Sequence, residues 1–111
     1  MKTIDISKLE NIGVSHDPAI KKRVILGRGE LPHLNNLSQV RFKTGQVASS
    51  HSHKDMYEVF LIEEGEGTVI FNTEEQRLKK GICVVVEPGE LHEVKNTGKS
   101  DLVITYFGIT A

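Results

Sequence analysis

The chain has 111 residues, a net charge of −1 and one cysteine, and these features exclude several classes of protein. Its length is that of a single domain. Positive and negative residues are mixed along the chain, which argues against a nucleic-acid or membrane-binding surface, and no apolar run reaches transmembrane length. Because Cys83 has no cysteine partner and the first 13 residues lack the apolar region of a signal peptide, we expect no internal disulfide and a cytoplasmic location.

Residues 1–22 are weakly patterned, and we expect them to form an N-terminal segment that packs on the domain formed by residues 23–111. Within this segment, residues 16–22 predict a short helical turn. Asp17 would be its N-cap and Pro18 its first helical residue.

Residues 23–111 carry short runs rich in Val, Ile and Leu, separated by Gly, Pro, Asn and Asp. Such runs favour β-strands, and many short strands at close spacing are typical of an antiparallel sandwich or barrel. The predicted strands are 23–26, 37–42, 46–53, 57–64, 67–71, 76–80, 82–87, 91–96 and 102–109. We therefore expect an all-β domain.

The segment Glu87–Glu90 predicts a type II turn. Proline pre-sets the backbone at the first central position, Pro88, and glycine tolerates the positive φ of the second, Gly89. This turn places His92 near the start of the strand that follows.

Two histidines lie one residue apart on the predicted strand 46–53. Because side chains alternate along a strand, His51 and His53 point to the same face, together with Val47 and Ser49 if the strand is regular. Taken alone, such a pair is more often a feature of a solvated strand than a metal site.

Glu58 opens the next predicted strand and His92 opens a later one, and these two residues change the balance. If all three strands face one interior, three imidazoles and a carboxylate converge, which suits Mn, Fe, Co, Ni, Cu or Zn. A structural zinc site is the poorer interpretation, because such sites favour thiolates and Cys83 is the only thiol.

The stretch from residue 45 to 65 resembles the first motif of the cupin superfamily, G(X)5HXH(X)3,4E(X)6G. Gly45, His51, His53, Glu58 and Gly65 all fall on this motif without a gap.

The second cupin motif, G(X)5PXG(X)2H(X)3N, is met at Gly81, Gly89, His92 and Asn96. The motif's proline is the exception, since Pro88 stands one place later than the motif requires. The spacing from Gly89 to His92 is kept, so the departure concerns the shape of the turn more than the ligand.

The resemblance covers about a third of the chain and implies a small jelly-roll β-barrel with four metal ligands. These ligands would be His51, His53, Glu58 and His92, holding one divalent transition metal ion. Cupins include dioxygenases, isomerases, epimerases, sugar-binding regulators and storage proteins, so the fold does not fix the function.

Several residues outside the ligand set are assigned structural roles. His16 and His33 are expected in solvated loops, and Cys83 in a strand that is buried on both faces. Tyr57 should point away from the Glu58 side into packing, and Asn96 should make a structural hydrogen bond.

Arg41 and Tyr106 are the remaining candidates for the ligand pocket. Arg41 lies on an alternating strand whose polar face is either solvated or at the pocket mouth, where it would bind a carboxylate or phosphate. Tyr106 either lines the cavity or packs beneath it. The sequence leaves both choices open and identifies no catalytic residue.

Two hypotheses for function follow from the sequence. The first is a metal-dependent enzyme on a small polar molecule, with oxygenase or isomerase type chemistry. The alternative is a non-catalytic module that binds or senses a carboxylate or a sugar, and a metal that mainly stabilises the fold is a third possibility. A homodimer is also expected, because the strand 82–87 is apolar on both faces and a chain this small has difficulty covering both.

Overall fold

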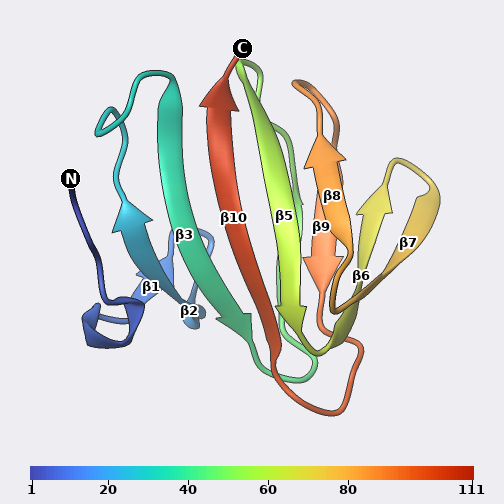
Figure 1. The fold of residues 1–111 in the computed structure, drawn as a ribbon. Coiled ribbons are helices and arrows are strands. Elements are labelled where there is room, and N and C mark those ends of the chain that lie inside the picture. The colour runs from blue at the N-terminus through green and yellow to red at the C-terminus, as the bar shows by residue number, and fades with distance from the viewer.

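Ten strands form two antiparallel sheets that pack against each other, as Figure 1 shows. The computed structural model describes residues 1–111. A 3-10 turn, η1 (Ile6–Lys8), precedes the strands. The strands are β1 (Ile12–Val14), β2 (Asp17–Leu26), β3 (Leu34–Phe42), β4 (Val47–His51), β5 (Met56–Glu64), β6 (Glu66–Phe71), β7 (Glu74–Lys79), β8 (Cys83–Val86), β9 (His92–Lys95) and β10 (Leu102–Thr110). The predicted all-β jelly roll is confirmed.

The larger sheet has the order β1-β2-β3-β10-β5-β8 and the smaller one the order β4-β9-β6-β7. The chain passes from the larger sheet to the smaller after β3 and returns for β5, so strands adjacent in space are often distant in sequence. The last strand, β10, lies in the middle of the larger sheet between β3 and β5 (Figure 1).

The core lies between the two sheets and is built by alternation along the strands. On β5, for example, Glu58, Phe60 and Ile62 are buried while their neighbours face outward. The smaller sheet contributes fully buried residues such as Val69 and Leu78 to the same cluster. Burial of this apolar surface is what holds the two sheets together.

Every predicted strand corresponds to a strand of the structure, but the predicted helical turn at residues 16–22 is wrong. Asp17 begins β2, and its carboxylate accepts a hydrogen bond from the backbone N–H of Ala19 at 3.0 Å, a local turn contact rather than a helix cap. Backbone pairing of β2 with both β1 and β3 outweighs the capping signal. The predicted boundary between residues 22 and 23 lies within β2.

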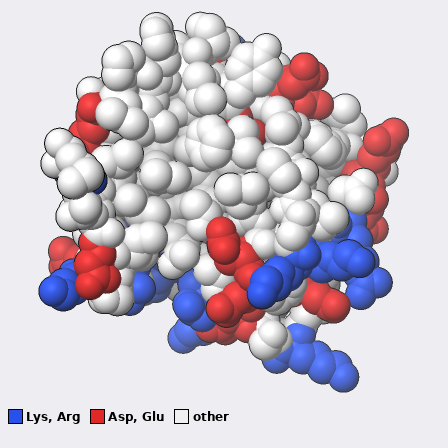
Figure 2. Space-filling model, in the orientation of Figure 1, with Lys and Arg blue, Asp and Glu red and all other residues white.

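The outward face of the larger sheet is rich in apolar side chains. Tyr57 and Val85 are 40% and 54% exposed there. The prediction of a buried Cys83 is wrong, because alternation along β8 buries Val84 and Val86 and leaves Cys83 exposed. Figure 2 views this side and shows a broad uncharged area, with the charged residues gathered mainly along its lower edge.

Asn96 makes the predicted structural hydrogen bonds. Its side-chain amide donates to the carbonyl oxygens of Phe42 and Ser100, both at 2.9 Å, and its own oxygen accepts from the N–H of Gly98 at 2.9 Å. The residue is 1% exposed, so water cannot replace these bonds. Asn96 thus fixes the connection between β9 and β10 against the end of β3.

We expect Asn96→Ala to lower the free energy of unfolding by about 2–4 kcal/mol, because it leaves buried carbonyl groups without donors. Urea titration followed by circular dichroism measures this change. The exposed neighbour variant Thr97→Ala should stay within about 0.5 kcal/mol of the wild type. Equal effects of the two substitutions would contradict this account.

Candidate metal centre

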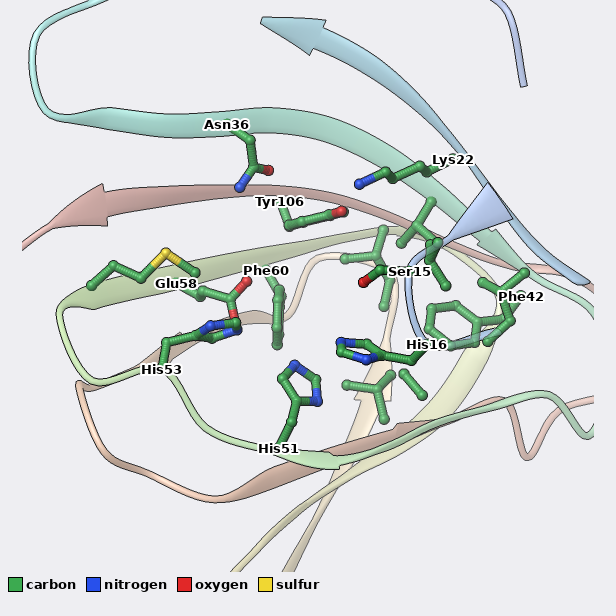
Figure 3. A pocket seen from close by; sticks show the side chains of 17 residues that line it. Ser15, His16, Lys22, Asn36, Phe42, His51, His53, Glu58, Phe60 and Tyr106 are labelled. Carbon is green, nitrogen blue, oxygen red and sulfur yellow. The ribbon is translucent and has the colours of Figure 1, made fainter. Parts of the chain in front are cut away.

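Three histidines and one glutamate from both sheets converge at one end of the sandwich. His51 ends β4 and His92 begins β9 in the smaller sheet, whereas Glu58 lies on β5 in the larger sheet. His53 follows in the loop after β4. One nitrogen or oxygen atom of each residue lies within 4.8 Å of the others. Figure 3 shows His51, His53 and Glu58 directed towards the same space.

An irregularity in β4 gives His51 its direction. Ala48 pairs with Val94 and His51 pairs with His92, so two residues of β4 lie opposite the single residue Glu93 of β9, where a regular ladder would place one. As a result, Ala48 shares the cavity side with His51. Val47 and Ser49 are predicted to share this face only if the strand is regular, and the irregularity in β4 means that this condition is not met.

The predicted type II turn is confirmed, and it supports the loop that carries His53. Gly89 has a φ of 82°, and the N–H of Glu90 donates to the carbonyl oxygen of Glu87 at 3.1 Å. The N–H of Gly89 also donates to the carbonyl oxygen of His53 at 2.7 Å. A glycine is therefore favoured at position 89, where φ is positive, and the hydrogen bond from this turn holds the backbone of His53 in place.

Two backbone carbonyl groups orient the imidazoles. Nδ1 of His51 lies 2.7 Å from the carbonyl oxygen of Ser49, and Nδ1 of His92 lies 3.0 Å from that of Glu90. Because a carbonyl oxygen only accepts, each Nδ1 donates a proton to it. In the neutral ring the lone pair is then on Nε2, the arrangement that a metal ligand needs.

The Glu58 carboxylate lies between the imidazole rings of His53 and His92. Its Oε1 is 3.2 Å from Nε2 of His53 and 3.3 Å from Nε2 of His92. Oε1 of Glu58 and Nε2 of His92 are both buried, and neither has a hydrogen-bond partner. Two acceptors that face each other without a proton call for a cation between them. The cluster therefore fits a divalent metal ion, with three nitrogen donors and one oxygen donor.

The electrostatic effects on the two ordered rings differ. Burial lowers the pKa of His51, and the neighbouring imidazoles act in the same direction. Burial also disfavours the charged form of His92, but the Glu58 carboxylate and the Glu90 carbonyl outweigh it and raise the pKa of His92. In the absence of metal, a proton on His92 would therefore supply positive charge next to the Glu58 carboxylate.

The cluster lies in the wall of a cavity of about 220 Å³ between the sheets. A water molecule occupies about 30 Å³ in the liquid, so the cavity has room for more than the open positions of a metal ion. Its walls are mainly apolar, with Val40, Phe42, Phe60 and Ile104 among the lining residues.

His16 was expected to be solvated, but it lines this cavity. His16 lies on the turn between β1 and β2, and its side chain is exposed. Its ring centre is 5.1 Å from the ring centre of His51. It therefore sits at the cavity mouth (Figure 3). The sequence-based interpretation missed it because residues 16–22 were assigned to a helical turn rather than to a hairpin.

The structure decides the two open assignments. Tyr106 lines the cavity, where burial raises the pKa of its phenol and the Glu58 charge acts in the same direction. Arg41 lies outside, where it forms an ion pair of 3.1 Å with Asp101. Lys22 is instead the basic residue that lines the cavity. Its alternation with Ile20 would have identified it if β2 had been predicted as a strand from residue 17.

The model of the family described as "Cupin domain" matches residues 38–108. The chain belongs to the cupin family. The match includes the whole smaller sheet, the larger sheet without β1, β2 and the ends of β3 and β10, and all four residues of the candidate metal centre. No helix of this cupin is long and apolar enough to cross a membrane.

Two sequence relatives are informative. An oxalate-binding protein of Thermotoga maritima is 29% identical over 65 residues, which are 59% of this cupin and 54% of that protein. The match thus spans about half the length of that relative. An uncharacterized protein of Aquifex aeolicus is 21% identical over 103 residues, 93% of this chain and 83% of its own.

Solved structures agree on the fold. A predicted oxalate decarboxylase from Thermotoga maritima has a TM-score of 0.92 at 20% identity, with 99% of this chain and all of that chain covered. KdgF from Halomonas sp. has a TM-score of 0.82 at 21% identity, covering 97% and 94%. At these identities the likeness concerns the fold alone.

In metal-free protein, Glu58→Gln should lower the pKa of His92, because only Glu90 would then oppose the effect of burial. A raised folded-state pKa stabilises the fold below pH 6.5, and this contribution is lost as the pH rises through the raised value. NMR titration of the His92 ring after chelator treatment measures the shift. Glu93→Gln is the matched control, and unchanged pKa values in both variants would refute the role of Glu58.

Proposed function

We propose that this cupin binds one divalent transition metal ion through His51, His53, Glu58 and His92 and holds a small carboxylate on that ion. The unpartnered, buried acceptors Glu58 Oε1 and His92 Nε2 are the observation that carries the proposal. The metal would be Mn, Fe, Co, Ni, Cu or Zn, all of which accept imidazole and carboxylate ligands. When bound, it would act as a Lewis acid towards an oxygen of the ligand.

A carboxylate is favoured over a sugar by the nature of the cavity. A sugar presents hydroxyl groups on most sides, whereas most of the cavity lining is apolar. Four protein ligands leave one or two positions on a five- or six-coordinate ion, enough for a carboxylate. The names of the oxalate-binding relative and of the predicted oxalate decarboxylase point to the same class of ligand.

His51→Ala, His53→Ala and His92→Ala should each reduce metal content by at least about tenfold, because each removes one of few neutral donors. Elemental analysis of protein purified without added metal or a metal-affinity tag measures this. His33 lies outside the cluster and has a φ of 67°. Asparagine tolerates this conformation, so His33→Asn is the matched control. The ligand assignment fails if all four variants keep the wild-type metal content.

Oxalate should bind to the metal-loaded protein and not to chelator-stripped protein, because the proposed contact is with the ion itself. Isothermal titration calorimetry compares the two samples, with His92→Ala as the variant expected to behave like the stripped protein. Binding of equal strength with and without metal would rule out a carboxylate held on the ion.

An enzyme is the second candidate, with oxygenase or isomerase type chemistry. Two cavity groups favour it: the exposed imidazole of His16 beside His51, and the phenol of Tyr106, whose raised pKa keeps it protonated at neutral pH. The imidazole can exchange a proton with a bound ligand, and the protonated phenol can donate a hydrogen bond to it. Incubation of the metal-loaded protein with oxalate under air, followed by product analysis, separates turnover from binding alone.

We also propose that the protein is a homodimer formed through the outward face of the larger sheet. The N-terminal segment of residues 1–22 would pack beside this face. The apolar side chains of this face are cross-strand neighbours. Tyr57 pairs with Ile109, and Leu61 pairs with Cys83. A second copy would cover them. The free thiol of Cys83 agrees with a reducing, cytoplasmic location.

Light scattering at tens of micromolar, about the usual working range, should report a dimer for the wild type. Val85→Lys should shift the protein towards the monomer, because it places a charge in the apolar face. Gln76→Lys adds the same charge on the smaller sheet and should leave the dimer intact. A monomeric wild type would show that the apolar face remains uncovered.

A further inference from the structure

Three consecutive basic residues on β2 point to different sides of the larger sheet. Lys21 and Arg23 line a groove on the outside, whereas Lys22 lines the cavity between the sheets. Lys22 follows Ile20 on the same face, and Ile20 is only 1% exposed. Lys22 is partly buried and is the only lysine or arginine among the residues that line the cavity.

No protein group compensates the charge of Lys22. The five ion pairs of the structure do not include it, and its ammonium group donates no hydrogen bond to the protein. Its neighbour Lys21, by contrast, donates to the carbonyl oxygen of Pro18 at 2.6 Å. An anion in the cavity would supply the missing counter-charge.

Two polar side chains lie on the same wall as Lys22. Tyr106 on β10 pairs with Ser38 on β3, and Asn36 lies one inward position further along β3. The side-chain oxygen of Asn36 is buried and without a partner. In Figure 3 the amino group of Lys22, the hydroxyl of Tyr106 and the amide of Asn36 follow one side of the pocket, away from His51. The cavity thus has a second polar site besides the metal centre.

The charges of the cavity indicate the charge of its ligand. Lys22 is positive and Glu58 is negative, and the histidines would be neutral as metal ligands. A divalent ion in the proposed site therefore leaves two positive charges unbalanced. A ligand with two negative charges would neutralise the cavity.

The spacing of the strands indicates the length of the ligand. Lys22 is on β2 and Glu58 on β5, with β3 and β10 between them. Three strand spacings of about 4.8 Å, roughly 14 Å in all, separate the two backbones across the sheet. Lys22 is also level with Ile62, through Val40 and Ile104, so Glu58 lies four residues, roughly 13 Å, farther along the strands. A lysine side chain spans only part of that distance. Oxalate, whose two carboxylates are directly joined, is too short to reach both the metal centre and Lys22.

We propose that the ligand is a dicarboxylate with a longer carbon chain than oxalate, with one carboxylate on the metal and the other on Lys22 and Tyr106. This inference rests on the proposed function, since it assigns the first carboxylate to the metal. Lys22 supplies the ion pair, the Tyr106 hydroxyl donates to the same carboxylate, and the apolar walls contact the carbon chain.

Calorimetric titration of metal-loaded protein with succinate, butyrate and oxalate tests the inference. Succinate should bind at least tenfold more tightly than butyrate, which has a methyl group in place of the second carboxylate. Lys22→Met should weaken succinate about ten- to a hundredfold, as for the loss of a charged hydrogen bond. The same Lys22→Met substitution should change the affinity for oxalate by less than about threefold. Lys21→Met removes the same charge from the outer face and is the matched control.

The outcomes separate the two proposals. If neither oxalate nor succinate binds in a metal-dependent way, the proposed function fails. If oxalate binds but succinate is no better than butyrate, the dicarboxylate inference is overturned while the proposed function stands, and this comparison needs only the wild type. If Lys22→Met and Lys21→Met weaken succinate equally, Lys22 has no special role. Melting curves and Lys22→Arg, which keeps the charge, show whether a loss of binding reflects misfolding.

Discussion

The contact between Glu58 Oε1 and His92 Nε2, 3.3 Å apart and away from water, is the constraint on which the site depends. Both atoms are acceptors in the deprotonated state, so the fold brings together groups that repel unless a cation separates them. The two residues belong to different sheets. The packing of the two sheets therefore holds these acceptors in place, and an ion bound between them would link the sheets directly.

The cavity is organised around two charged positions with apolar walls between them. Glu58 and the imidazoles lie at one position, and Lys22 lies at the other beside Tyr106. Apolar walls keep the local dielectric low, which strengthens electrostatic contacts at both positions. His16 lies at the cavity mouth near His51, so this mouth and the candidate metal centre share the same edge of the sandwich.

The strands, the type II turn and the convergence of the four candidate ligands could be predicted because each depends on local rules. Alternation predicts the faces, Gly89 predicts the turn and the cupin motifs predict the ligand set. The errors have a common origin in pairing between distant segments. Pairing of β1 with β2 outweighs the capping signal at Asp17. Because a helical turn was predicted there, the positions of His16 and Lys22 on the cavity lining were not predicted.

The exposure of Cys83 and the irregularity at Ser49 have the same explanation, since each depends on which strand lies alongside. A single apolar run cannot show whether one or both of its faces are covered. Sequence reasoning was therefore most reliable for side chains whose direction follows from their own strand. It was least reliable for those whose surroundings are set by β2, β8 and the bulge of β4.

The central place of β10 has a consequence for synthesis of the chain on the ribosome. A nascent chain that extends only to Asp101 lacks the strand that joins β3 to β5, so β5 and its Glu58 have no partner on that side. The larger sheet can close only after β10 has left the exit tunnel. Until then the inward apolar residues of β3 and β5 are exposed, which makes the unfinished chain a natural client of chaperones. The candidate metal centre, which includes Glu58 on β5, is consequently completed only once β10 has emerged and paired.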